Sequence, residues 1–102
     1  MRIISRKRLK AFAERHSDAA EPLGKWYQLA RQARWQSLQD VRQVYPHADA
    51  VSVASGNTVT VFNIGGNKYR LIAAIHYDGQ RVYVLRVLTH AEYSKNLWKD
   101  SL

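Results

Sequence analysis

The chain has 102 residues, a length that suits one domain, and we expect a single domain over residues 1–102. Lysine and arginine number 16 against 8 acidic residues, which gives a net charge of +8 and an isoelectric point near 10.1. The absence of cysteine excludes disulfides and thiolate metal sites, and no apolar run approaches the ~20 residues that a membrane span requires.

The positive charge favours a polyanionic partner. A charge of this size on a small domain raises the local concentration of nucleic acid, and a basic isoelectric point is typical of nucleic-acid-binding proteins. It could also serve solubility or seat an acidic partner protein. The run from Met1 to Arg8 lacks the apolar segment of a signal peptide, so we expect a cytoplasmic protein that makes no membrane contact.

Three helices are predicted in the first half of the chain. The first follows Ser5, which would be its N-cap, and the second has Pro22 in its first turn. Ser37 and Asp40 have the spacing of a capping box for a short third helix, which ends before Pro46. The apolar stripes of the first two helices are Leu9, Phe12, Ala13 and His16, and then Leu23, Trp26, Tyr27, Ala30 and Ala33.

The second half of the chain predicts three β-strands. They cover Thr58–Ile64, Tyr69–Tyr77 and Val82–Leu88, and turns at residues 65–67 and 78–79 separate them. Helices followed by such a β-meander indicate the α+β class.

Alternating apolar residues predict which face of each strand is buried. The odd positions of Tyr69–Tyr77 and of Tyr83–Val87 are apolar or aromatic, so we expect both sets to share the core face. That register requires an odd-length loop such as residues 78–80. The opposite face could bind nucleic acid or be covered by the last helix. It would carry the cations and apolar residues Arg70, His76, Arg86, Ile72, Ala74, Val82 and Val84.

A short motif, Thr89-His-Ala-Glu-Tyr93, follows the last strand directly. Thr89 and Glu92 match a capping box, which favours a structural role for Glu92 over a catalytic one. His90 then occupies the first helical position, and Tyr93 lies three residues further on the same side. Free N–H groups at a helix start attract phosphate and disfavour a protonated imidazole, so His90 could act as a neutral base. It could equally be a hydrogen-bonded surface residue.

These residue types suit RNA cleavage without a metal. That reaction needs a base for the 2′-hydroxyl, an acid for the leaving 5′-oxygen and a cation for the developing phosphorane charge. His90 and Tyr93 can supply the acid and the base in either order. Arg70 can supply the cation, because its planar guanidinium matches two phosphate oxygens, although it could also be an ordinary cation on an outward strand face. We therefore predict Arg70, His90 and Tyr93 as catalytic residues, with no cofactor and no metal site.

Two runs of residues carry a family signature, the hairpin sequence Val61–Leu71 and the terminal motif Thr89–Tyr93. Further matching segments are Met1–Lys7, Glu21–Leu23, Trp26–Tyr27, Trp35, Asp40–Val41 and Tyr45–Asp49. Together these ordered motifs span nearly the whole chain and resemble the HigB family of RelE-like mRNA interferase toxins.

The resemblance implies a RelE-like fold, with N-terminal helices packed on a small, mostly antiparallel sheet and a short C-terminal helix. It also implies an endoribonuclease, the toxin of a type II toxin–antitoxin pair, that cleaves mRNA in the A site of the translating ribosome. A helix-turn-helix antitoxin, HigA-like and encoded by a neighbouring gene, would neutralise it, and operator DNA would be bound only through the toxin–antitoxin complex. There are two alternatives, a non-catalytic RNA- or DNA-binding module and a protein that binds an acidic peptide. Neither of them needs an acid–base pair.

The resemblance also assigns residues by position. The matching positions are Asn63, Asn67, Lys68, Arg70, His90 and Tyr93. Beside the catalytic residues, we expect the RNA-binding residues to be Asn63, Asn67, Lys68, Arg86 and Lys95. The chain departs from the family pattern at Leu85, Leu88 and Ser94, where the family shows a basic residue, a glycine and an aspartate.

Overall fold

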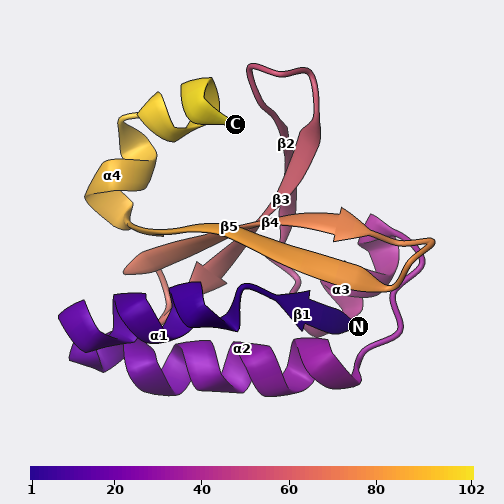
Figure 1. The fold of residues 1–102 in the computed structure, drawn as a ribbon, viewed down its shortest axis with the longest axis horizontal. Coiled ribbons are helices and arrows are strands. Elements are labelled where there is room, and N and C mark those ends of the chain that lie inside the picture. The colour runs from indigo at the N-terminus through magenta and orange to yellow at the C-terminus, as the bar shows by residue number, and fades with distance from the viewer.

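A five-stranded mixed sheet forms the centre of the computed structural model, which describes residues 1–102 (Figure 1). The strand order is β1-β5-β4-β3-β2, and all neighbours are antiparallel except the parallel pair β1 and β5. The strands are β1 (Arg2–Ile4), β2 (Asp49–Ser52), β3 (Thr58–Ile64), β4 (Tyr69–His76) and β5 (Arg81–Thr89). The helices are α1 (Arg6–Arg15), α2 (Ala20–Gln32), α3 (Leu38–Val44) and α4 (His90–Ser94), with 3-10 turns η1 (Ser17–Ala19) and η2 (Leu97–Ser101).

This arrangement confirms the predicted α+β class, with N-terminal helices, a mostly antiparallel sheet and a short C-terminal helix. Helices α1 and α2 cover one face of the sheet, whereas α4 and η2 lie over the other (Figure 1). None of the helices combines the length and apolar character that crossing a membrane would take.

Both faces of the sheet are buried. The main core lies between the helices and the sheet and includes Phe62 and Leu71, each of which contributes about 1.5–3 kcal/mol by burial. Successive residues of a strand face opposite sides, so Ile72 belongs to the second face. The buried residues of that second cluster are Val53, Val59, Val61, Ile72 and Trp98. The C-terminal segment therefore packs against the face opposite to α1 and α2.

The helices begin and end close to the predicted positions. Pro22 lies in the first turn of α2, where its missing N–H breaks no helical bond, and α3 ends before Pro46. Ser5 and Ser37 occupy N-cap positions, but neither side chain makes a capping hydrogen bond. The capping box predicted for Ser37 is wrong, because the carboxylate of Asp40 accepts a hydrogen bond from the backbone N–H of Gln36 at 2.8 Å.

The predicted register is correct for β4 and wrong for most of β5. In β4, Leu71 and Ala73 lie in the main core as expected. In β5, however, the core residues are Val82 and Val84, not Tyr83 and Leu85, although Val87 does pack against the core. The sheet has a β-bulge here: Ile72 pairs with Arg86 and Ala73 with Val84, so Leu85 has no partner. The connecting loop is also even in length, because His76 pairs with Arg81 across residues 77–80.

Two strands were not predicted. β1 has only three residues and pairs in parallel with Arg81–Tyr83, and β2 has four residues and pairs with β3 at the other edge. Strands this short show too few alternating residues to be recognised by their period.

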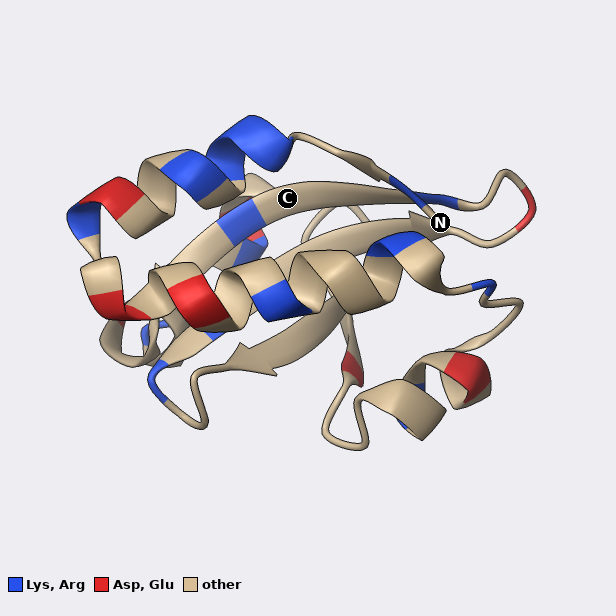
Figure 2. Ribbon diagram, turned by 90° about the horizontal axis from the view of Figure 1, so that it is seen from below, with Lys and Arg blue, Asp and Glu red and all other residues tan.

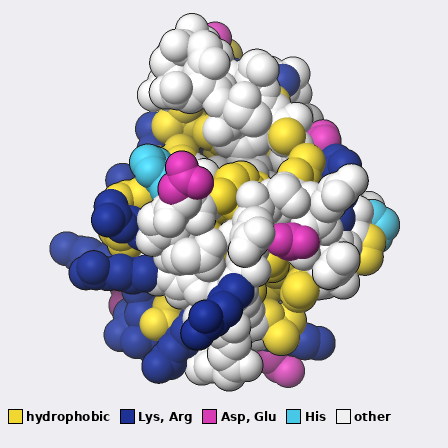
Figure 3. Space-filling model, turned by 90° about the vertical axis from the view of Figure 1, so that its right-hand side faces the viewer, with side chains coloured by type: hydrophobic (Ala, Val, Ile, Leu, Met, Phe, Trp, Pro, Cys, Tyr) yellow, Lys and Arg dark blue, Asp and Glu magenta, His cyan; other side chains and the backbone are white.

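The basic residues are distributed unevenly over the two layers. Figure 2 shows Lys and Arg concentrated along α1. In Figure 3, Lys and Arg side chains gather in the lower half of the view, on the side of α1 and α2, while fewer lie above, toward the β2–β3 hairpin. The helical layer therefore carries much of the net positive charge.

Candidate active site

Arg70 lies on β4 beneath the C-terminal segment, and only 8 % of it is exposed. Its guanidinium carbon is 5.3 Å from the centre of the Tyr93 ring, within the range of a cation–π contact. The guanidinium donates hydrogen bonds to the backbone carbonyls of Asn67 at 3.1 Å and Tyr69 at 3.2 Å, and to Oδ1 of Asn67 at 3.4 Å. Arg70 is therefore not the freely exposed outward cation that the strand pattern predicts.

Helix α4 is fixed at its start by the capping box that the sequence predicts. Oγ1 of Thr89 accepts a hydrogen bond from the N–H of Glu92 at 3.2 Å, and the Glu92 carboxylate accepts one from the N–H of Thr89 at 3.0 Å. The hydrogen bond from the Thr89 backbone lowers the pKa of the Glu92 carboxyl, and the nearby positive charge of Arg15 lowers it further. Glu92 thus has the structural role expected of it.

The first residue of α4 is also joined to the β3–β4 hairpin. The backbone N–H of His90 donates to the carbonyl oxygen of Lys68 at 2.9 Å. The His90 side chain is exposed. The two sequence motifs Val61–Leu71 and Thr89–Tyr93, which are separate in the chain, therefore meet at one end of β4 and β5.

Tyr93 makes a second aromatic contact that the sequence did not reveal. Its ring stacks on Trp98 with centroids 5.3 Å apart and planes 17° apart, and the indole N–H donates to the Tyr93 carbonyl at 3.1 Å. Trp98 lies five residues beyond Tyr93, outside helical spacing. Its only signal in the sequence is that a large aromatic residue near a chain end requires an apolar surface to cover it.

The remaining predicted RNA-binding residues differ in their surroundings. Asn63 pairs with Arg70 across β3 and β4, so the two side chains share a face. Arg86 donates to the carbonyl of Leu85 at 2.8 Å and to the hydroxyl of Ser101 at 3.4 Å. Lys95 is exposed at the end of α4. The structure therefore brings together Arg70, Asn67, Asn63 and Tyr93, with His90 at the start of the same helix as Tyr93.

Lys68 points to a different partner. Its ammonium group forms an ion pair with Oδ2 of Asp18 at 2.7 Å, and the hydroxyl of Tyr69 donates to Oδ1 of Asp18 at 2.5 Å. These two hydrogen bonds lower the pKa of the Asp18 carboxyl. Asp18 was not singled out in the sequence, because its partners lie 50 residues away. It connects the β3–β4 hairpin to η1.

We expect Asp18→Asn to destabilise the protein in a pH-dependent way. The folded state lowers the pKa of Asp18 below its ordinary value of 3.8, so this stabilisation is complete above that pH and is lost as the pH falls through the lower folded value. The melting temperature of the variant should lie below that of the wild type at about pH 7, and the two should converge below pH 3.8. Melting curves followed by circular dichroism test this. A constant difference at every pH would contradict it.

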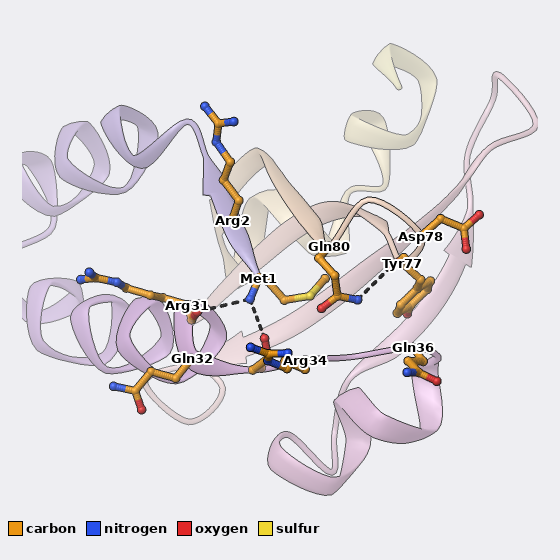
Figure 4. Close-up of a pocket in the computed structure, with 10 residues that line it drawn as sticks. Met1, Arg2, Arg31, Gln32, Arg34, Gln36, Tyr77, Asp78 and Gln80 are labelled. Atoms are coloured by element: carbon orange, nitrogen blue, oxygen red, sulfur yellow. Dashed lines mark hydrogen bonds between the residues drawn. The ribbon is translucent and has the colours of Figure 1, made fainter.

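The largest cavity lies beside the N-terminus, between the end of α2 and the β4–β5 turn (Figure 4). It has a volume of about 810 Å³ and is lined by Arg2, Arg31 and Arg34, among others. Tyr77 at its rim is seven residues beyond Arg70 along an extended chain, a separation of ~23 Å. It contains no histidine, so it offers no counterpart to the His90–Tyr93 pair. Nowhere do three His, Asp or Glu side chains come close enough together to hold a metal ion.

Comparison of the sequence with known proteins places the chain in a family. A sequence model described as HigB_toxin, the RelE-like toxic component of a toxin–antitoxin system, matches residues 19–96. The mRNA interferase toxin HigB of Escherichia coli K12 is 28% identical over 93 residues, which cover 91% of this chain and 88% of that protein. The mRNA interferases HigB of Shigella flexneri and of Escherichia coli O6:H1 are also 28% identical, the latter over 93% of this chain and 90% of its own length. The hairpin and the terminal motif that meet at Arg70 and Tyr93 both fall within the matched residues, and the chain belongs to the HigB family of RelE-like toxins.

Proposed function

We propose that this protein is the toxin of a type II toxin–antitoxin pair and a metal-independent endoribonuclease that cleaves mRNA on the translating ribosome. Family membership and the mRNA interferase names of its relatives support the RNase activity. The observation that carries the proposal is that Arg70 and Tyr93 lie side by side, because this places a group that can bind phosphate next to a group that can transfer a proton. A basic surface alone would require no such contact.

In this proposal, His90 and Tyr93 are the general acid and base of a transesterification. The base removes the proton of the 2′-hydroxyl, and the 2′-oxygen attacks the adjacent phosphorus. The bond from phosphorus to the 5′-oxygen breaks as the acid protonates that oxygen, which leaves a 2′,3′-cyclic phosphate and a 5′-hydroxyl end. Proton transfer of this kind accelerates a reaction by roughly 10²–10⁴-fold.

Arg70 would stabilise the charge of the phosphorane, and the substrate must first reach it. With 8 % of its surface exposed, the guanidinium faces Tyr93 and carbonyl oxygens rather than solvent. A cation–π contact is worth about 0.5–2 kcal/mol, whereas hydrogen bonds to a charged group are worth about 1.5–3 kcal/mol each. Two bonds from the guanidinium to a phosphate therefore outweigh the contact with Tyr93. We infer that the Tyr93 ring moves aside when RNA binds.

The partners follow from the same proposal. They are mRNA in the ribosomal A site and a helix-turn-helix, HigA-like antitoxin encoded by a neighbouring gene. Operator DNA is bound only through the toxin–antitoxin complex, and the protein acts in the cytoplasm. Asn63, Asn67, Lys68, Arg86 and Lys95 are proposed to bind RNA. Lys68 is already paired with Asp18, so a phosphate would share its ammonium group with that carboxylate or compete for it.

Expression of this chain without its antitoxin should arrest growth, because cleavage of mRNA on ribosomes removes the messages. Growth curves and mapping of mRNA ends after induction measure the effect. The matched control is the double variant His90→Ala with Tyr93→Phe, which keeps the basic surface and lacks both proton-transfer groups. Normal growth with intact mRNA would exclude the toxin proposal, and arrest by the control variant as well would favour a non-catalytic RNA-binding module.

A further inference from the structure

A cleft lined by arginines lies next to the proposed active site. It has a volume of about 280 Å³ and lies between α1 and the end of β5. Its charged lining residues are Arg8, Arg15, Arg86 and Glu92. In Figure 1, α1 and α4 lie on the same side of the molecule, below and above the end of β5. The cleft opens between these elements.

The arginines of this cleft outnumber its one acidic residue, and none of them forms an ion pair. The protein forms two ion pairs, between Arg42 and Asp49 and between Lys68 and Asp18, and neither involves the cleft. The single acid in the cleft, Glu92, receives the Thr89 N–H in its capping box instead. Arg15 lies close enough to Glu92 to lower the pKa of that carboxyl, and the guanidinium of Arg86 bonds Leu85 and Ser101. Three arginines against one carboxylate still leave the cleft with a net positive charge, which favours binding of an anion.

The spacing along α1 suits an anion with repeated charges. Arg8 and Arg15 are seven residues apart, which is two helical turns or ~10.5 Å along the axis. Both lie on the flank of α1 that borders β5, while Leu9 and Phe12 fill the core beneath. A polymer with several phosphates can place a different phosphate on each of these two arginines.

The cleft also leads to the proposed active site. Leu88, which lines it, is the cross-strand partner of Arg70. Glu92, which also lines it, directly precedes Tyr93. The Cβ atoms of cross-strand partners lie about 4.5–5.5 Å apart, so the Leu88 end of the cleft adjoins the strand that carries Arg70.

We propose that this cleft binds the backbone of single-stranded RNA next to the scissile phosphate, and that Arg8 and Arg15 each bind a different phosphate. The proposal rests on the proposed function. The cleft guides the strand along α1 and past Leu88 to Arg70 and Tyr93. Arg8 and Arg15 take no part in the chemistry, and they set how tightly RNA is held.

The test is the double variant Arg8→Glu with Arg15→Glu, and its matched control is Lys7→Glu with Lys10→Glu. Both variants change the net charge equally and on the same exposed helix, but the control residues do not line the cleft. The probe is a fluorescent RNA of about 12 nucleotides with 2′-O-methyl groups throughout, which cannot be cleaved. Its affinity is measured by anisotropy between about 50 and 200 mM salt.

The cleft variant should bind at least about tenfold more weakly than the control at low salt. The slope of log K against log salt is about −0.7 for each phosphate contact on a single strand, so losing two contacts should flatten it by about 1.4. Circular dichroism confirms that both variants are folded. On ribosomes, the cleft variant should require more toxin for half-maximal cleavage, while its maximal rate stays near that of the wild type.

The outcomes separate the two proposals. Equal affinity and slope for both variants would overturn the RNA cleft, even if the wild type cleaves mRNA. A wild type that never cleaves mRNA would overturn the proposed function, while the uncleavable probe still reports on the cleft. If a polyglutamate peptide binds as tightly as RNA and the cleft variant loses both, the partner is an acidic protein, and the RNA assignment is wrong.

Discussion

Arg70→Lys should reduce mRNA cleavage by about 10²–10³-fold, the effect of removing one preorganised donor from a charged transition state. Lysine keeps the positive charge but lacks the planar fork that bonds two phosphate oxygens at once. Lysine is preferable to alanine because Arg70 is buried and donates to the carbonyls of Asn67 and Tyr69. Alanine would leave these acceptors without donors, at a cost of about 1–3 kcal/mol, so lost activity could then reflect lost structure.

Single-turnover cleavage on programmed ribosomes measures this effect, and thermal melting shows whether the variant is folded. Arg86→Lys is the matched control, since Arg86 is on the neighbouring strand and its guanidinium bonds a carbonyl and a hydroxyl of the protein. Arg86→Lys should change the rate much less than Arg70→Lys. If Arg70→Lys cleaves at the wild-type rate, Arg70 is only a structural residue beneath Tyr93.

His90→Ala and Tyr93→Phe should each slow cleavage by about 10²-fold or more, because each removes one of the two proton-transfer groups. Tyr93→Phe removes only a hydroxyl and keeps the ring that contacts Arg70 and stacks on Trp98. The His90 side chain is exposed, and its backbone bond to Lys68 does not depend on the imidazole. Neither change should therefore disturb the fold.

Glu92→Gln is the control for this pair. Glutamine still accepts the Thr89 N–H in a capping box, so stability and cleavage should change little. The pH dependence of the single-turnover rate adds a second readout, because losing the general base or the general acid removes one limb of the profile. An inactive Glu92→Gln together with a fully active His90→Ala would reverse the roles, with the carboxylate as base and His90 as a helix-start residue.

Local features of the fold were predictable because neighbouring residues determine them. The apolar stripes of α1 and α2 and the Thr89–Glu92 capping box depend on residues three or four positions apart. The register of β5 was not predictable in the same way. Before the bulge at Leu85, the even-numbered residues Val82 and Val84 face the core, whereas after it the odd-numbered Val87 does. The alternation of apolar residues in that strand gives no sign of this change.

The candidate site likewise has some residues that local sequence predicts and others that depend on tertiary contacts. Arg70, His90 and Tyr93 could be selected from their chemical types and from short motifs. Trp98 stacks on Tyr93, and Asp18 binds Lys68 and Tyr69 of the hairpin, and both act through contacts that the sequence does not encode locally. Asp18 meets the hairpin across 50 residues, and Trp98 meets Val59, Val61 and Ile72 only once the sheet has formed. The burial of Arg70 also depends on this packing, which is why the strand pattern alone predicted an exposed side chain.

The shortage of ion pairs has a thermodynamic consequence for the free protein. With 16 lysines and arginines and two ion pairs, most of the cations repel one another across a small surface. Such repulsion destabilises a compact state, and it weakens when salt shortens the Debye length to about 10 Å at 0.1 M. A polyanion that binds only the folded form stabilises it further by mass action. The isolated chain at low ionic strength is therefore the least stable form of the protein, and a bound polyanion protects it from unfolding.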